Sequence, residues 1–146
     1  LEEFRDALRP CLAALSREPG LTVEVRPHPA HGKGPPEDGL EASLLRCDVV
    51  LGSGSSAILE GLRVGRPAVL LPGATGADPA GYGREGLASA CEDVASLPAL
   101  CRKLAGPEGR ADAAIAAERV WGGSPDDPVG EVLRAGLITK HYGTIR

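Results

Sequence analysis

A short, unbroken apolar run that turns directly into a helix is the feature that most constrains the fold of this chain. Residues 48–51 (Asp-Val-Val-Leu) are predicted to form a strand, and such a run suits a parallel strand that is buried on both faces. The sequence Gly-Ser-Gly-Ser-Ser follows at residues 52–56, and a helix is predicted from about Ser56 to Val64, with Gly65 at its C-cap. Strand, glycine-rich turn and helix in this order indicate one unit of an α/β sheet.

The rest of the chain repeats this alternation. Further strands are predicted over residues 21–25, 68–71 and 87–91, and further helices over residues 1–15, 40–46, 97–104, 110–121 and 129–137. A chain of 146 residues is about one domain long. We therefore predict a single Rossmann-like domain over residues 1–146, with a parallel sheet of three to five strands and helices on both faces.

Composition excludes several classes of function. A net charge of −4 and only four aromatic residues do not provide the basic, stacking surface that nucleic acids need. No apolar run approaches the roughly 20 residues of a membrane span, and no signal peptide is present, so we expect a cytoplasmic protein. The four cysteines form no CxxC pair and no zinc spacing with histidine, which predicts small buried side chains in a reducing compartment and no metal site.

The first residue already belongs to a helical pattern. Leu1 is not a methionine, and apolar residues recur from it at helical spacing as far as the Pro-Gly pair at residues 19–20. A processed start and a cut from a longer chain both explain such a beginning. We favour the cut, and expect the domain to be a fragment of a longer two-domain chain.

Polar residues follow two of the predicted strands where each one ends. Arg-Pro-His-Pro at residues 26–29 ends the first, and the glycine–serine turn at 52–56 ends the second. In parallel sheets the carboxyl ends of strands meet at one edge, where helix N-termini offer free N–H groups to anions. The two segments therefore predict an anion-binding cleft for a phosphate or diphosphate.

The glycine–serine turn carries groups that suit phosphate. Its glycines, including Gly54, allow a close approach of ligand to backbone, and the hydroxyls of Ser53, Ser55 and Ser56 can donate to phosphate oxygens. The turn is neither a GxGxxG nor a P-loop pattern. An ordinary helix cap made by Ser55 or Ser56 explains the same residues without a ligand.

Two further side chains are candidate ligand contacts. His28 lies between prolines that restrict its backbone, and its imidazole could donate to a phosphate or act as an acid, although a surface histidine is the commoner case. Glu60 cannot form a capping box because Ala57 stands where serine or threonine is required. Its carboxylate is then left without a partner and could accept from sugar hydroxyls, or it is a solvated helix residue.

Several other residues receive weaker predictions. His31 and Lys33 add possible donors beside His28, and the long glycine-rich loop over residues 72–86 has a length typical of functional or mobile loops. The arginines near these segments are expected to be solvated or paired, with Arg84 the best of them for a ligand contact; they are Arg26, Arg63, Arg66 and Arg84.

With these motifs the sequence over about residues 20–105 resembles the C-terminal half of GT-B glycosyltransferases. The nearest groups are bacterial capsule polysaccharide and CDP-glycerol glycerophosphotransferase-like enzymes, with sialyltransferases and UDP-N-acetylglucosamine 2-epimerases as relatives. The epimerase alternative is weaker, because residues 72–78 lack the arginine- and glutamate-rich stretch of those enzymes. The resemblance implies that His28, Ser55 and Ser56 contact the donor phosphates, with His28 as the catalytic residue, and that Glu60 meets donor hydroxyls.

The resemblance also implies partners. The ligand is a nucleotide-activated sugar or polyol, UDP-, CDP- or CMP-linked, and no other cofactor is expected. GT-B enzymes carry the acceptor site and usually the base on an N-terminal Rossmann domain, so the isolated chain should bind donor but not turn over. The alternative is a free-standing nucleotide-binding or regulatory subunit that completes a two-chain transferase. A homodimer and a place at the inner membrane face through partners remain open.

Overall fold

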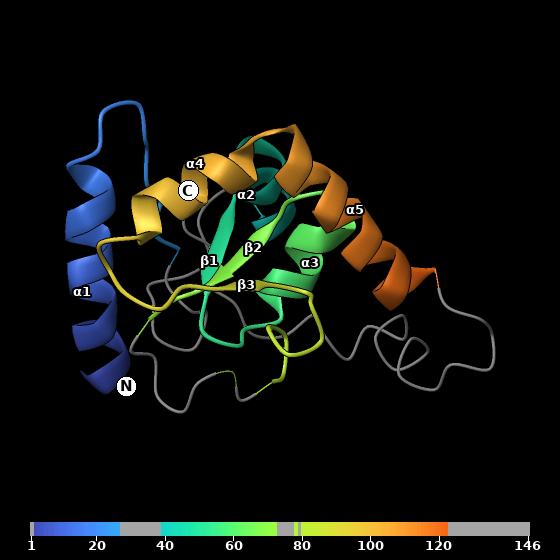
Figure 1. Ribbon diagram of the computed structural model, residues 1–146, viewed down its shortest axis with the longest axis horizontal. Helices are drawn as coiled ribbons and strands as arrows, with labels where there is room; N and C mark the ends of the chain where they lie inside the picture. The colour runs from blue at the N-terminus through green and yellow to red at the C-terminus, as the bar shows by residue number, and fades with distance from the viewer. Residues whose placement is uncertain (1, 27–38, 73–77, 79, 123–146) are drawn as a thin grey trace.

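A computed structural model describes residues 2–26, 39–72, 78 and 80–122 (Figure 1). The described elements run in the order α1 (Glu2–Ser16), α2 (Leu40–Arg46), β1 (Val50–Gly52), α3 (Ala57–Arg63), β2 (Ala68–Leu70), β3 (Ser89–Ala90), α4 (Leu97–Ala105) and α5 (Pro107–Trp121). Each lies within a few residues of an element predicted from the sequence. The helix predicted over residues 129–137 falls outside the described residues.

The three strands form one parallel sheet in the order β1-β2-β3. Val50 pairs with Ala68, and Val69 pairs with Ser89, so β2 is the central strand. Helix α3 connects β1 to β2, as the strand–turn–helix pattern predicts. The prediction of an α/β domain with a parallel sheet is therefore confirmed for the described part of the chain.

Helices cover both faces of this sheet. Alternate strand residues Leu51 and Val69 share one buried cluster with residues of α1 and α4, whereas Val50 and Leu70 share another with residues of α2 and α3. Helix α5 does not contribute to either cluster and packs on α3 instead. Figure 1 shows α1 and α5 at opposite sides of the sheet. Burial on both faces explains why the strands are apolar throughout.

The strand predicted over residues 21–25 is wrong as a regular strand, because only Val25 makes a bridge. Its side chains nevertheless alternate as in a strand. Leu21 and Val23 pack on the cluster of α1 and α4. Glu24 and Arg26 both contact the side chain of Ser43 in α2, and Glu24 also lies near Arg46. Within the described residues, side chains rather than a backbone ladder hold this segment to the domain. Pro27, which has no N–H to donate, follows it directly in the sequence.

Helix α3 approaches β1 closely at Gly61. A Cβ atom built at this glycine would lie 2.6 Å from Cγ2 of Val50, which is fully buried. Only a residue without a side chain allows this separation between the helix and the strand. The contact holds α3 against β1 immediately after the glycine–serine turn.

We expect Gly61→Ala to destabilise the fold, although alanine favours a helix by up to about 1 kcal/mol over glycine. Forcing a methyl group into a packed core costs about 1–3 kcal/mol, so the net loss should be at least about 1 kcal/mol in urea unfolding. The control is the same change in a Val50→Ala background, where the clashing methyl is absent. Equal destabilisation in both backgrounds would contradict this account of the contact.

Candidate functional site

The glycine–serine turn leaves the carboxyl end of β1 and leads into α3. Gly54 has a φ of +87°, a conformation that side chains disfavour, so glycine is required at the centre of the turn. Residues 53–56 are partly exposed. Ser55 and Ser56 present their carbonyl oxygens to the helix, accepting from the N–H groups of Ile58 and Glu60 at 3.0 Å in both cases. The turn is thus built at the sheet edge where the sequence predicts it.

The two serines at the helix start differ in their contacts. Oγ of Ser55 accepts a hydrogen bond from the backbone N–H of Ala57 at 3.3 Å, which is the contact of a helix cap. Ser56 occupies the N-cap position but makes no capping hydrogen bond with its side chain. The cap interpretation of the turn therefore fits Ser55, whereas the hydroxyl of Ser56 does not serve as a cap.

Glu60 has a partner that the sequence analysis missed. Its Oε2 lies 3.2 Å from Nε of Arg63, and its side chain is only 14% exposed. The expectation of a carboxylate without a partner is wrong, because residues three apart lie side by side on a helix. The arginine neutralises the carboxylate and fixes its direction, and one oxygen remains able to accept from a hydroxyl group.

His28, the predicted phosphate contact and acid, lies outside the described residues, as do His31 and Lys33. The same holds for residues 73–77 and 79 of the long loop. The structure therefore fixes one side of the predicted cleft, the turn after β1. The position of the histidine relative to Ser55 and Ser56 stays a prediction.

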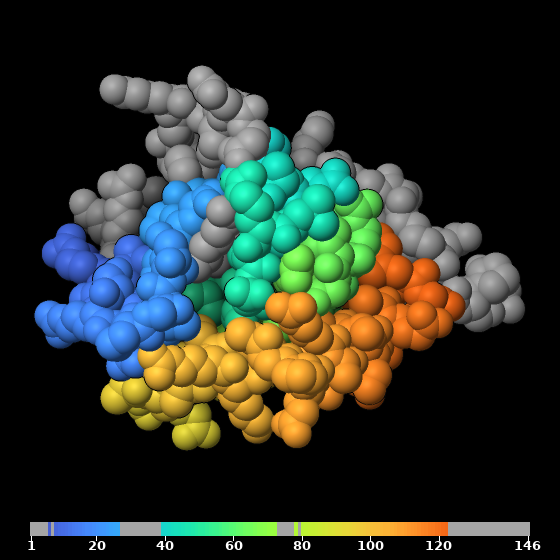
Figure 2. Space-filling view, turned by 90° about the horizontal axis from the view of Figure 1, so that it is seen from above, coloured from blue at the N-terminus to red at the C-terminus, as the bar shows by residue number. Residues whose placement is uncertain are grey.

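Arg26, two positions before His28, is held in the fold by polar contacts. The guanidinium of Arg26 is buried, donates to Oγ of Ser43 and lies 3.8 Å from the carboxylate of Glu24. Ser43 donates to the same carboxylate at 2.9 Å, and Arg46 approaches it from α2 at 3.9 Å. Figure 2 shows the chain before residue 27, in light blue, beside α2, in teal. This cluster anchors the chain where it enters the histidine segment.

Arg26 was predicted to be solvated or paired, and it is paired and buried. Two residues apart on an extended segment, Glu24 and Arg26 lie on the same face, which is the one signal in the sequence for their contact. The third member of the cluster, Ser43, is 17 residues away and carries no such signal.

The other arginines have structural roles. Arg66 donates to the carbonyl oxygens of Leu44 and Leu45 at 3.1 and 2.8 Å, so that it closes the C-terminal end of α2. Arg63 pairs with Glu60, and the side chain of Arg84 is exposed. A paired or solvated charge was the expectation for all three; it fits Arg63 and Arg84, whereas Arg66 donates to backbone carbonyl oxygens instead.

Asp78 orders the described end of the long loop. Its φ is +60°, and its Oδ2 accepts hydrogen bonds from the backbone N–H groups of Gly83 and Arg84 at 2.8 and 3.1 Å. Oδ1 is buried and has no hydrogen-bond partner among the residues that the structure describes. The carboxylate therefore closes a tight turn beside β2, where Gly83 lies against Leu70.

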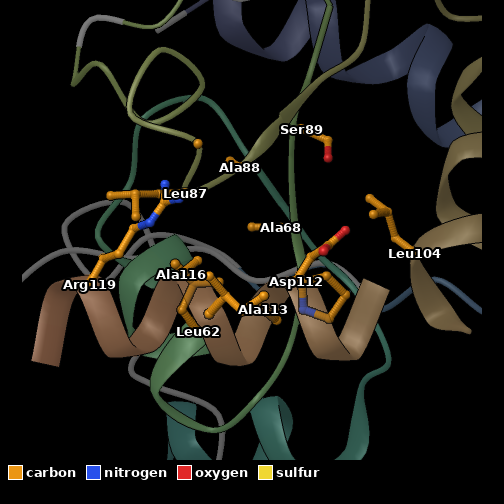
Figure 3. A pocket seen from close by; sticks show the side chains of 13 residues that line it. Leu62, Ala68, Leu87, Ala88, Ser89, Leu104, Asp112, Ala113, Ala116 and Arg119 are labelled. Atoms are coloured by element: carbon orange, nitrogen blue, oxygen red, sulfur yellow. The ribbon is translucent and has the colours of Figure 1, made fainter. Parts of the chain in front are cut away.

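Two hollows in the described surface lie toward the other end of the sheet. A groove of about 410 Å³ is lined by residues at the starts of β2 and β3 and by α5 (Figure 3). A second hollow of about 290 Å³ lies between residues 20–23, the start of β1 and α4. Neither includes the glycine–serine turn.

The cysteines are poor candidates for nucleophiles or metal ligands. All four are free and buried, as the sequence predicts. Burial raises the pKa of Cys47 and of Cys101 to about 11, and burial together with the nearby Cys91 raises the pKa of Cys11. The reactive thiolate is therefore scarce at neutral pH. Among the described residues, no group of three His, Cys, Asp or Glu side chains could hold a metal ion.

Comparison of the chain with protein-family models, curated proteins and solved structures gives no match. In the described part of the chain, no helix is both long and apolar enough to cross a membrane. Inferences about function therefore depend on the residues themselves.

The raised thiol pKa values predict how stability depends on pH. The folded state keeps the protons of Cys47 and Cys101 up to about pH 11, whereas exposed thiols lose theirs near pH 9. The unfolded state then binds fewer protons in this window, so the free energy of unfolding should fall as pH rises from 9 to 11. Urea unfolding at pH 8, 9, 10 and 11 measures the slope.

The Cys47→Ala/Cys101→Ala double variant is the control for titration of tyrosine and lysine. It should lose less stability than the parent over the same range. An identical slope in both proteins, or rapid labelling of all four thiols in the folded parent at pH 8, would show that the thiols are not held in a protected, protonated state.

Proposed function

We propose that this domain binds the nucleotide-activated donor of a cytoplasmic transferase that builds a bacterial surface polysaccharide or a glycerophosphate polymer. In this proposal it is the donor half of a GT-B enzyme, and the donor is a UDP-, CDP- or CMP-linked sugar or polyol. The observation that carries the proposal is the turn of residues 52–56, with its positive-φ glycine and partly exposed serines at the carboxyl end of a buried parallel strand.

The chemistry of this turn favours a phosphate ligand. Ligands of open parallel sheets lie beyond the carboxyl ends of the strands, where backbone N–H groups and hydroxyls face the crevice. Residues 53–56 are partly exposed, and Gly54 has no side chain to hinder a ligand. Hydrogen-bond donors arranged in this way stabilise the negative charge that develops on a departing nucleotide.

Two further residues complete the proposed donor site. Arg26 anchors the chain two residues before His28. In this proposal His28 donates to the donor phosphates. Glu60, one turn into α3 and held by Arg63, accepts from the hydroxyl groups of the sugar or polyol. In this scheme His28 also protonates the leaving phosphate oxygen.

A second Rossmann domain, on a longer chain or on a partner, would supply the acceptor site and the base. Two large apolar side chains offer part of a docking surface for it, Val25 at 48% exposure and Leu45 at 56% exposure. The isolated 146-residue chain should then bind a donor without transferring its sugar or polyol to an acceptor.

The phosphate contacts are tested by calorimetry with UDP, CDP, CMP and GDP. We expect one of these nucleotides to bind, and the Ser55→Ala/Ser56→Ala double variant to bind it about tenfold more weakly, since each lost neutral hydrogen bond costs about 0.5–1.5 kcal/mol. Ser16→Ala, an exposed serine at the end of α1, is the matched control. Failure of the parent to bind any of the four would contradict the proposal.

The proposed contacts of His28 and Glu60 are told apart by comparing the bare nucleotide with the intact donor. His28→Ala should weaken binding of the bare nucleotide by roughly tenfold, because a charged hydrogen bond contributes about 1.5–3 kcal/mol. Glu60→Gln should weaken binding of the intact donor and leave binding of the bare nucleotide unaffected. Arg63→Gln removes the ion pair but keeps the Glu60 carboxylate, so it separates the effect of the ion pair from that of the carboxylate itself. If His28→Ala binds as tightly as the parent, the histidine is not a phosphate contact.

A further inference from the structure

The groove of about 410 Å³ lies between an extended stretch and a helix. Residues 86–89 form one wall, and α5 forms the other from Asp112 to Arg119 (Figure 3). The lining residues include Ala68 at the start of β2 and Ala113 and Ala116 on α5. These small side chains leave a depth that larger ones would fill. The volume falls within the range of roughly 300–1,000 Å³ that is typical of small-molecule sites.

The groove is apolar in its middle and charged toward its ends. In Figure 3 the carboxylate of Asp112 and the hydroxyl of Ser89 face the same end, and Arg119 extends beside Leu87 at the other. Asp112 and Ser89 have no side-chain hydrogen bond or ion pair with any residue that the structure describes. Arg119 makes one long contact, 3.4 Å from Nη1 to the carbonyl oxygen of Glu85. The polar groups of the groove are therefore available to a ligand.

The spacing of the charges selects the shape of that ligand. Asp112 and Arg119 are seven residues apart on α5, which separates them by about 10 Å along the helix axis. An extended peptide advances about 3.3 Å per residue, so three residues cover this length. Its amino group would meet Asp112 and Ser89, its carboxylate would meet Arg119, and its central side chain would lie over the alanines.

We propose that this groove is a binding site for a short apolar peptide with free, charged ends. The site is independent of the proposed donor site, because it lies at the starts of β2 and β3, whereas the glycine–serine turn follows the carboxyl end of β1. Leu62 of α3, the helix that follows the turn, is buried beneath the groove. The two ligands therefore do not compete for the same space.

The probe is the tripeptide Ala-Leu-Ala with free ends, titrated into the full 146-residue chain and followed by amide NMR shifts. For a ligand of this size we expect a dissociation constant on the order of 0.1–1 mM. The shifts should concentrate on Ala88, Ser89 and Ala116. The same tripeptide with acetyl and amide groups on its ends should bind at least about fivefold more weakly, because both ion pairs are lost.

Variants on the same helix provide the matched controls. Asp112→Asn and Arg119→Gln should each weaken binding of the free tripeptide about threefold, as expected for exposed ion pairs, while Glu108→Gln and Arg110→Gln, which do not line the groove, should leave it unchanged. Equal binding of the blocked and free peptides would overturn the proposed charge recognition. No shifts at the groove up to about 10 mM peptide, ten times the weakest expected dissociation constant, would overturn the site itself.

Discussion

The close approach of α3 to β1 is the constraint on which the rest of the described fold depends. Helix α3 has only seven residues, yet it connects two parallel strands and contributes to two of the three apolar clusters. Without a side chain, Gly61 lets this short helix lie directly on Val50. The glycine–serine turn between the strand and the helix is therefore held at both of its ends, and α5 can pack on the opposite side of α3.

Local pattern was enough to predict most elements, because apolar residues at helical or strand spacing specify which face is buried. The bounds of α2 agree with the prediction. Strand β1 begins two residues late, at Val50, which pairs with Ala68, because Pro67 before Ala68 has no N–H with which to extend the ladder. Residues 21–25 show the limit of such reasoning. Their alternation predicts which side chains point to which layer, but a backbone ladder depends on a neighbour that the local sequence does not specify.

In the candidate site, too, local features could be predicted from the sequence, whereas contacts between distant elements could not. The turn could be predicted because glycine and serine residues have strong local preferences, and the contact between Glu60 and Arg63 could have been predicted from their spacing on a helix. The burial of Arg26 could not, since it depends on Ser43 in another element. The groove beside α5 was missed for a different reason: its depth comes from alanines, which are common in any helix and give no signal of a cavity.

Arg66 joins α2 to the segment between α3 and β2 through its side chain. It stands between α3 and β2, and its guanidinium closes the last carbonyl groups of α2. Fraying of α2 would therefore leave those carbonyls without their partner and would loosen the segment that precedes β2. The helix and the β1–α3–β2 unit should then open together as one cooperative unit, and their amide hydrogens should exchange with similar protection. The end of α1 is linked to α4 instead, because Arg102 lies 3.0 Å from the carboxylate of Glu18 and donates to the carbonyl oxygen of Pro19 just beyond the helix.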